Sequence, residues 1–315
     1  LVFMHIPYSL ATASTEADTS TEADTNTEAD TSTEADTSTE TSDSAETDTN
    51  VGDSYVLSEE YFFSDLPIVF SATRLKQTVK ETPVSMTVIN KEMIESSGAL
   101  EIADLMRLVP GMQVSNYVGD KYFVTYHGRA DLYSRSLQVL VDGRSRYDPV
   151  IGGVSWTDLP VALEDINRIE VIRGSNAAAY GANSFSGVIN IITEHPSQQY
   201  GTLIKTTFSD KQTRKILARN AGVIGDFDYR ITLNYDESEG LKSRYDDSTT
   251  KWMSFRGDYK LDPSNQIAFQ TGYSSGTQDD GLPGHAFLIP RETGNSSNFQ
   301  QIKWTHTTDD DNEYS

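Results

Sequence analysis

The second half of the chain alternates between apolar and polar side chains with a period of two. Three stretches carry the pattern: Tyr229, Ile231, Leu233 and Tyr235 interleave with Arg230, Thr232, Asn234 and Asp236; Phe255, Gly257, Tyr259 and Leu261 interleave with Ser254, Arg256, Asp258 and Lys260; and Ile267, Phe269 and Tyr273 continue it. Successive side chains of a β-strand point to opposite faces, so this pattern predicts strands with one apolar and one polar face. We expect strands near residues 200–209, 212–222, 227–238, 249–262, 264–276 and 296–308.

The connections between these predicted strands alternate in length. Those at 223–226, 262–265 and 309–312 are short, whereas those after Tyr235 and Tyr273 are long and polar. Short turns on one side and long loops on the other are typical of outer-membrane β-barrels. The brief turn at 209–211 is an exception on the long side, and a soluble β-sandwich with the same alternation stays open as an alternative.

The middle of the chain combines short strands with short helices. Residues 83–89 (PVSMTVI) alternate as a strand, and Asn90 is placed to cap a helix that ends at Gly98. A second helix is predicted by the apolar stripe Ile102, Leu105, Met106 and Val109, and it ends at Pro110 and Gly111. Further strands are expected at 112–114, 122–126, 137–141, 166–172 and 188–193, with a helical turn from Pro160 to Asp165. This mixture predicts a compact α/β (α+β) unit.

The start of the chain carries two segments of different character. Residues 1–10 (LVFMHIPYSL) are apolar and lead into small residues at 11–14, as in the later part of a secretory signal peptide whose basic front is missing; a frayed apolar N-terminus is the alternative. Residues 14–50 then repeat the motif STEADT. A segment with so many carboxylates and only alanine as an apolar side chain cannot bury enough surface to fold, so we expect a disordered, extended tether.

Charge and composition exclude several classes of function. The net charge is −22, but residues 1–73 hold 16 of the 47 acidic residues and no Lys or Arg, which leaves 31 acidic against 25 basic residues afterwards. No basic surface for nucleic acid is indicated. The chain has no cysteine, and its five histidines are scattered without metal-ligand spacing. With no nucleophile motif and no phosphate-binding loop, we expect no catalytic residue, no metal, no cofactor and no enzyme.

A series of motifs between residues 66 and 193 resembles a known family. The series consists of VLVDGR at 139–144, LEDINRIEVIRG at 163–174, YGAN at 180–183 and GVINIIT at 187–193. In order and spacing it resembles the plug domain of TonB-dependent outer-membrane receptors. Two departures stand out, because the family commonly has Pro where this chain has Ser175, and Arg in a strand where it has His127.

The resemblance implies structural or coupling roles for residues of these motifs, which are Asp142, Gly143, Arg173, Gly174, Tyr180, Gly181 and Asn183. Glycines permit the tight turns of such a plug, and Arg173 is expected to pair with carboxylates on a surrounding barrel wall. The alternative is that Arg173 and Asn183 only hold the plug together. We favour that alternative over direct transport chemistry.

The resemblance also implies the domain organisation. We expect a signal-peptide remnant at 1–13, the acidic tether at 14–50, a TonB-box region at 51–74, the plug at 75–195 and the first part of a transmembrane antiparallel β-barrel at 196–315. Plugged transporters have about 22 strands, of which about six are present, so the barrel is expected to be truncated after its first third. The expected location is the outer membrane of a Gram-negative bacterium, in contact with its lipid.

A short apolar segment before the plug is a candidate for energy coupling. Ile68, Val69, Phe70, Ser71 and Ala72 resemble the TonB box, which in this family adds as a strand to the periplasmic domain of TonB, itself joined to an inner-membrane energising complex. Two alternatives stay open. The segment is either the first strand of the plug, or the true box lies at Val56 and Leu57.

The expected function is energy-coupled import of a large scarce nutrient, with a ferric siderophore favoured over a corrinoid or an oligosaccharide. A sensing receptor with little uptake is the alternative. A folded signalling domain near the N-terminus would favour this alternative, but the chain has the acidic repeat there. Predicted apical loops at 116–121 and 146–156 carry Tyr117, Arg146, Tyr147 and Trp156, which suit aromatic or anionic chelates. Packing against the barrel wall is an equal alternative for these four side chains.

Overall fold

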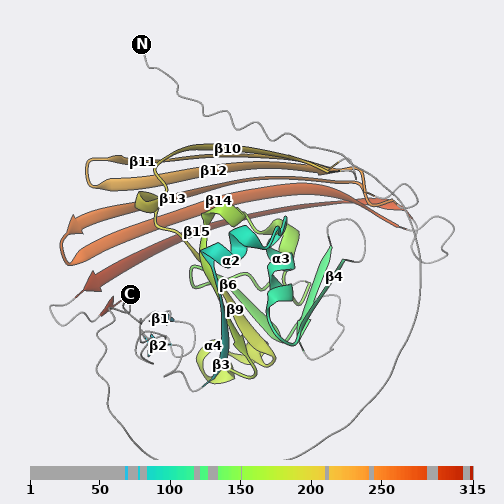
Figure 1. The fold of residues 1–315 in the computed structure, drawn as a ribbon, viewed down its shortest axis with the longest axis horizontal. Coiled ribbons are helices and arrows are strands. Elements are labelled where there is room, and N and C mark those ends of the chain that lie inside the picture. Colours follow the sequence, from blue (N-terminus) through green and yellow to red (C-terminus); the bar gives the residue numbers. More distant parts are fainter. Residues whose placement is uncertain are drawn as a thin grey trace, which may run out of the picture. The chain divides into compact units, whose positions relative to one another are not determined.

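The computed structural model divides the chain into two compact units, Leu1–Val56 and Leu57–Ser315, and the residues it describes all belong to the second. They are residues 68–69, 77–78, 84–116, 121–126, 134–149, 151–209, 213–240, 245–281, 290–307 and 313–314. The predicted signal-peptide remnant and acidic tether therefore lie outside the described residues. Within the second unit, a mixed α/β unit is followed by a meander of long antiparallel strands (Figure 1).

The α/β unit is built on a five-stranded sheet in the order β3-β8-β9-β6-β7. Its strands are β3 (Ser85–Asn90), β6 (Leu137–Val141), β7 (Arg144–Ser145), β8 (Ile166–Arg173) and β9 (Gly187–Thr193). Strands β6 and β9 pair in parallel, whereas the other neighbours are antiparallel. The central strands are apolar on both faces, which is why β6 is buried along its whole length.

Short helices cover this sheet and close its core. Asn90 caps α2 (Lys91–Ser96) by accepting a hydrogen bond from the backbone N–H of Met93, as the sequence predicted. The second predicted helix is α3 (Ile102–Leu105), which continues as the 3₁₀ turn η2 (Met106–Leu108). Other 3₁₀ turns are η3 (Trp156–Asp158), η4 (Leu163–Asp165), η5 (Ala182–Ser184) and η6 (Pro196–Gln198), and α4 spans Ala177–Tyr180. The main core joins the helices to the sheet through Leu105, Met106, Ile169 and Ile189, all fully buried.

Two strand pairs stand apart from the five-stranded sheet. The hairpin of β4 (Met112–Asn116) and β5 (Tyr122–Tyr126) packs its apolar side onto the main core through Val124 and Met112. Strands β1 (Ile68–Val69) and β2 (Gln77–Thr78) pair only with each other. No helix of the described residues is long and apolar enough to cross a membrane.

The meander sheet runs in chain order from β10 to β16. Its strands are β10 (Gly201–Phe208), β11 (Arg214–Ile224), β12 (Phe227–Ser238), β13 (Ser248–Asp262), β14 (Asn265–Asp280), β15 (Arg291–Thr307) and β16 (Glu313–Tyr314). The predicted strands are confirmed, but β14 and β15 extend several residues further than expected. Those extensions, TQDD at 277–280 and RETGN at 291–295, contain no apolar side chain, so they carry no alternation and only backbone pairing reveals them.

The two faces of the meander sheet have the predicted chemistry. Arg230 and Thr232 of β12 are buried, whereas Ile231 and Leu233, which alternate with them, are exposed. The exposed apolar side chains of the neighbouring strands include Ile204, Phe208, Ile216, Met253, Tyr259, Leu261, Phe269 and Ile302. A sheet that buries its arginines and exposes its leucines has an apolar face suited to lipid and a polar face directed inwards.

Candidate functional site

The inward polar face of the meander sheet meets the α/β unit at a buried carboxylate. Asp165 ends η4 at the start of β8 and is 1% exposed. One of its oxygens lies 3.1 Å from Nη1 of Arg219 on β11, and the other accepts a 2.7 Å hydrogen bond from Oγ1 of Thr232 on β12. The Nε atom of Arg230 lies 3.6 Å from the same carboxylate. A charge buried among two guanidinium groups and a hydroxyl joins the two parts firmly.

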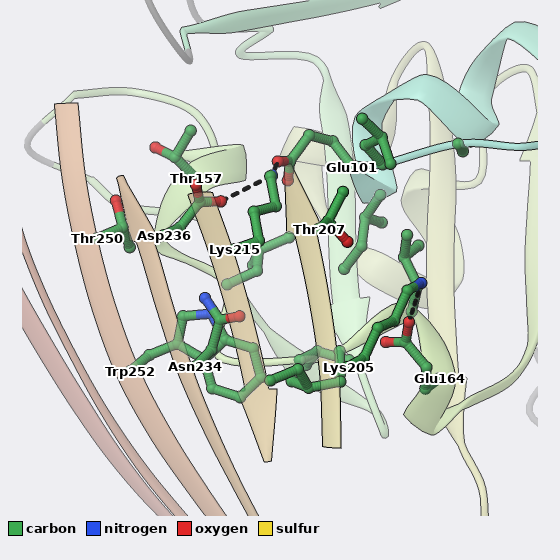
Figure 2. A pocket seen from close by; sticks show the side chains of 18 of the residues that line it. Glu101, Thr157, Glu164, Lys205, Thr207, Lys215, Asn234, Asp236, Thr250 and Trp252 are labelled. Carbon is green, nitrogen blue, oxygen red and sulfur yellow. Dashed lines mark hydrogen bonds and ion pairs between the residues drawn. The ribbon is translucent and has the colours of Figure 1, made fainter. Parts of the chain in front are cut away.

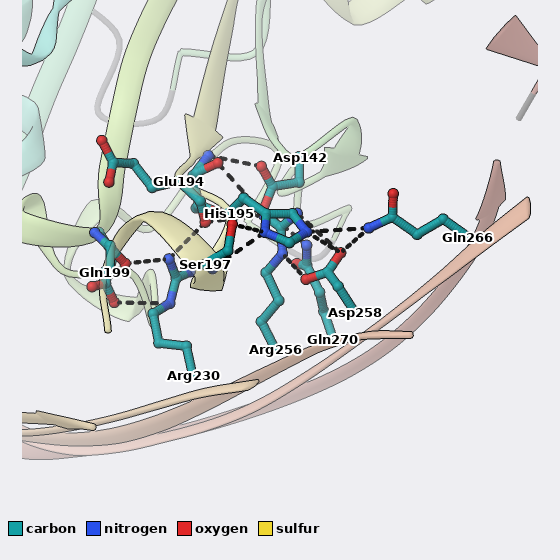
Figure 3. A network of polar contacts seen from close by, with 12 residues as sticks. Asp142, Glu194, His195, Ser197, Gln199, Arg230, Arg256, Asp258, Gln266 and Gln270 are labelled. Carbon is teal, nitrogen blue, oxygen red and sulfur yellow. Dashed lines mark hydrogen bonds and ion pairs between the residues drawn. The ribbon is translucent and has the colours of Figure 1, made fainter. Parts of the chain in front are cut away.

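Two arginines of the sheet also bind main-chain oxygens just after β9 (Figure 3). Arg230 donates from Nη1 to the carbonyl of Glu194 at 2.9 Å and to the side chain of Gln199 at 2.8 Å. Arg256 donates to Oγ1 of Thr193 at 2.9 Å and is oriented by a bidentate pair with Asp258 on its own strand. The end of β9 is therefore held by side chains from β12 and β13.

Asp142 belongs to the same network. The predicted Asp142–Gly143 turn is present, with positive φ angles of 49° and 81°. Its side chain accepts hydrogen bonds from the backbone N–H and the hydroxyl of Thr193, both at 2.8 Å, and from Nε2 of Gln270 on β14 at 3.0 Å. The turn thus has two roles, because it reverses the chain and also contacts the meander sheet. We refer to these contacts around Asp142, Asp165, Thr193, Glu194 and His195 as the polar latch.

His195 is the titratable member of the polar latch. The backbone N–H of Ser197 donates to its Nδ1 at 3.2 Å, and its Nε2 lies 3.1 Å from Nε2 of Gln266 and 3.6 Å from Oδ1 of Asp258. Burial lowers the pKa of His195 from its ordinary value, and although Asp258 opposes this, Arg256 acts with burial. The ring is therefore neutral at a pH where an exposed histidine begins to take up a proton.

The remaining predicted structural residues lie near the end of β8. Gly174 and Gly181 have φ angles of 102° and 87°, where side chains are strained, so the glycines are needed for the backbone path. Tyr180 packs on a small cluster with Ile172 and Val188. The Nε atom of Arg173 is buried without a hydrogen-bond partner, and Asn183 is half-buried on η5. The described ion pairs at the latch have the opposite polarity to the one expected for Arg173, since the carboxylate Asp165 comes from the α/β unit and the cations from the sheet.

The candidate ligand residues are dispersed, and Tyr117 lies outside the described residues. Trp156 is 9% exposed and belongs to the main core. Arg146 donates from Nη2 to the carbonyl of Asp158 at 2.7 Å, and burial lowers the pKa of its guanidinium. Tyr147 is half-buried. These contacts of Arg146 and Trp156 lie within the α/β unit, and a ligand contact for Arg146, Tyr147 and Trp156 stays a prediction.

Cavities lie between the α/β unit and the meander sheet on the side of β10 and β11. One of about 90 Å³ is lined by Glu101, Lys215, Asp236, Lys205 and Glu164 (Figure 2). Lys215 of β11 forms ion pairs with Glu101 and, at 2.7 Å, with Asp236 of β12. Lys205 of β10 lies 2.6 Å from Glu164. A second cavity, of about 780 Å³, opens beside the C-terminal ends of β10 and β12.

The predicted TonB-box segment is described only in part. Ile68 and Val69 form β1, paired antiparallel with Thr78 and Gln77, while Phe70, Ser71 and Ala72 lie outside the described residues. The extended backbone agrees with what strand addition needs. Strand β1 does not join the five-stranded sheet.

Sequence reasoning missed the arginines of the latch. The sequence pattern treats Arg230 and Arg256 only as polar positions of alternating strands and does not single out Arg219. A signal was available, because charged side chains on the inward face of a strand need partners, and the motif LEDI at 163–166 supplies a carboxylate. No group of three or more His, Asp or Glu arranged to hold a metal ion occurs in the described part of the chain.

Comparison with known proteins agrees with this architecture. A family model for the TonB-dependent Receptor Plug Domain matches residues 78–188, which contain the α/β unit nearly to its end. The match identifies residues 78–188 as a TonB-dependent receptor plug domain. The α/β unit is therefore the plug, the meander sheet is part of the barrel wall, and the protein is an outer-membrane protein of a Gram-negative bacterium. The family consists of transport receptors.

Sequence relatives include proteins with different named roles. The vitamin B12 transporter BtuB of Vibrio vulnificus (strain CMCP6) is 32% identical over 195 residues, which cover 60% of this chain and 30% of the relative. The iron-regulated outer membrane virulence protein of Vibrio cholerae is 28% identical over 235 residues, covering 70% and 35%. The chain thus spans about a third of the length of these relatives.

Solved structures share the fold at low identity. The ferripyoverdine receptor of Pseudomonas aeruginosa matches with a TM-score of 0.61 and 18% identity over 77% of this chain and 34% of that one. The ferric yersiniabactin uptake receptor FyuA from Yersinia pestis matches with a TM-score of 0.58 and 18% identity, over 72% and 39%. These matches confirm the plug and the antiparallel wall.

Proposed function

We propose that the protein imports a large scarce nutrient across the outer membrane, with energy supplied through TonB, and that the nutrient is a ferric siderophore. The proposal joins membership of a receptor family to the character of the interface between plug and wall. It treats the protein as a transporter and not as an enzyme.

One observation carries the proposal: the plug is apolar inside but attached to the wall mainly by polar contacts, with Ala162 packed on Leu217 and Trp252 as the apolar exception. Its main core unites helices and sheet around buried leucine, isoleucine and valine side chains. Its attachment at the latch uses Asp165 with Arg219, and the Glu194 carbonyl with Arg230. Polar contacts can exchange partners with water at a smaller cost than exposing a core, so the plug is able to shift while staying folded.

The energy for this shift is proposed to come through Ile68 to Ala72. An extended segment offers backbone N–H and C=O groups for pairing with a strand of TonB, and the side chains set the specificity. Force applied at this segment would reach the plug through its first strands. Pairing with TonB requires that the β1–β2 pairing be released or extended by a further strand.

The ligand class rests on the relatives. Ferripyoverdine and ferric yersiniabactin are named for two receptors of the same fold, and an iron-regulated protein is among the sequence relatives. A corrinoid is the second candidate, because the vitamin B12 transporter is 32% identical over the aligned part. A sensing receptor with little uptake would bind such a ligand without accumulating it.

The test is uptake by cells that express the full-length receptor in a strain lacking its own receptors for the probes. Iron-labelled ferric enterobactin, iron-labelled ferripyoverdine and labelled vitamin B12 are supplied separately, with and without an uncoupler. Uptake of an iron chelate that the uncoupler abolishes supports the proposal, whereas uptake of vitamin B12 alone selects the corrinoid. Surface binding without energised uptake of any probe selects the sensing receptor.

A further inference from the structure

Three cavities between the plug and the wall follow one another along β10 and β11. The largest, of about 780 Å³, reaches Thr207, Ser209 and Lys215. The small one, of about 90 Å³, shares Thr207 and Lys215 with it and also reaches Lys205. A third, of about 550 Å³, shares Lys205 with the small one and extends to Tyr200. Each cavity thus has lining residues in common with the next.

The series runs along the full length of the strands. The inward residues Leu203, Lys205 and Thr207 of β10 pair with Arg219, Leu217 and Lys215 of β11. From Tyr200 to Ser209 the chain covers about 30 Å at roughly 3.3 Å per residue, which is about the thickness of the hydrocarbon core of a bilayer. Because barrel strands are tilted by about 35–45°, this length covers about 21–25 Å of depth, so the cavities follow one another across most of the hydrocarbon core.

Two ion pairs join plug and wall at the narrow middle cavity. Glu101 of the plug pairs with Lys215, and Glu164 of the plug pairs with Lys205 at 2.6 Å. Figure 2 shows both pairs at the margins of this cavity. A space of about 90 Å³ is far smaller than the roughly 300–1,000 Å³ of ordinary ligand pockets. The middle cavity is closed to a chelate while these pairs are intact.

The plug segment beside the cavities is held on the plug by Ala99, which packs against the main core, and on the wall by Glu101. Residues 97–101 connect α2 to α3, and Ala99 and Leu100 line all three cavities. Leu100 is 48% exposed, which is unusual for a leucine between two folded parts, and Gly98 has a φ of 67° with open space around it. Among the described residues, Glu101 joins this connector to the wall through its ion pair with Lys215.

We propose that the gap along β10 and β11 is the route of the ligand past the plug, and that Glu101–Lys215 and Glu164–Lys205 are the two ion pairs that close it. The proposal rests on the proposed import function. Parting the pairs lets the 97–101 connector move away from the wall and joins the three cavities into one passage. The lining combines side chains of both charges with apolar ones such as Leu217 and Trp252, so it suits a chelate that carries both hydrogen-bonding groups and apolar surface.

The first test measures leakage and needs no ligand. The double variant Glu101→Gln with Glu164→Gln removes one partner from each pair while keeping side-chain size. Reconstituted in phospholipid vesicles, the full-length variant is expected to raise efflux of a trapped hydrophilic dye several-fold over wild type. Glu92→Gln is the matched control, because Glu92 is an exposed residue of α2 that lines none of the three cavities. Equal efflux from the double variant and Glu92→Gln would overturn the gating role.

The second test blocks the route. The chain has no cysteine, so Thr207→Cys provides a single thiol between the large and small cavities. Modification with a bulky thiol reagent is expected to remove most energised uptake of the probe that the unmodified variant imports. Ser297→Cys is the control, since it faces inwards on β15 away from these cavities. If Thr207→Cys imports a probe equally well before and after modification, the proposed route is wrong but the import function stands. If wild type imports no probe, the import function itself is wrong, and the proposed route is wrong with it.

Discussion

Thr232 of the wall donates a 2.7 Å hydrogen bond to Asp165 of the plug, and both residues are almost completely buried, at 0% and 1% exposure. The hydroxyl orients one carboxylate oxygen while Arg219 binds the other. A carboxylate with no exposure to water depends on these partners for its charge. The pair of residues therefore marks the place where plug and wall are most tightly joined.

Replacing Asp165 by Asn is expected to loosen the plug. The change leaves Arg219 and Arg230 close together without their counter-charge, and breaking a buried ion pair in this way costs about 3–5 kcal/mol. Thermal unfolding and limited proteolysis of the plug in the purified receptor measure the effect. Asp104→Asn is the control, because its pair with Arg107 is exposed and worth about 0–1 kcal/mol. Equal stability of the two variants would contradict a central role for Asp165.

Acidification is expected to weaken the latch through His195. Burial lowers the pKa of this ring in the folded protein, so the unfolded chain takes up the proton more readily. The contribution of the neutral ring is complete above the ordinary histidine pKa of about 6.5 and is lost as the pH falls from that value through the lowered pKa of the folded protein. The groups facing the ring are Asp258, Arg256, Asp228 and Lys260.

The pH effect is measured by thermal unfolding of the receptor between about pH 8 and pH 5. Wild type is expected to lose more stability over this range than His195→Gln, because glutamine does not titrate. Other groups titrate equally in both proteins, so the difference in slope reports His195 alone. Parallel curves for the two proteins would show that the ring does not act in this way.

The neighbours Arg146 and Tyr147 are expected to differ in their effects. Arg146→Ala removes the hydrogen bond to the carbonyl of Asp158 and should lower the thermal stability of the plug by about 1–3 kcal/mol. Tyr147→Ala should weaken binding of the transported chelate while leaving stability within about 0.5 kcal/mol of wild type. Binding to purified receptor and thermal unfolding separate the two. Unchanged affinity in Tyr147→Ala would remove this residue from the ligand site.

Proline at Val69 is expected to separate binding from uptake. The substitution deletes a backbone N–H and prevents strand pairing, so energised uptake should fall to the level seen with an uncoupler. Surface binding should persist, because the segment lies outside the plug core. Phe70→Ala is the comparison, with a modest loss, since it keeps the backbone groups. Wild-type uptake by Val69→Pro would redirect attention to Val56 and Leu57.

Alanine at Gly187 is expected to destabilise the plug sheet. A Cβ atom there would lie 2.6 Å from the carbonyl oxygen of Ile172 on the neighbouring strand β8. Since both strands are held in place by the core, overpacking of this kind costs about 1–3 kcal/mol. Thermal unfolding checks the cost. Gly143→Ala is the comparison variant, because its loss of stability comes from a φ of 81° and not from a steric clash. If Gly187→Ala unfolds at the same temperature as wild type, the strands can separate to make room for the Cβ atom.

The sequence by itself determined the elements and the two faces of the wall. Alternation around Ile231 and Leu233 depends only on the period of a strand, which is a local property of the backbone. The cap at Asn90 and the turn at Asp142 and Gly143 are likewise decided by nearby residues, and the structure has both. The ends of β14 and β15 were missed, because their polar residues are paired by hydrogen bonds to neighbouring strands and not by a local preference.

Only the tertiary structure decided which charges meet. Asp165 and Arg219 are 54 positions apart, and Asp142 and Gln270 are 128 apart, so no local pattern relates them. The same holds for Trp156, whose aromatic side chain suits a ligand by chemistry but is taken into the plug core. Local sequence fixes the direction in which a side chain leaves its strand, whereas its partner depends on how the strands cross. The latch and the gap along β10 and β11 arise from that crossing.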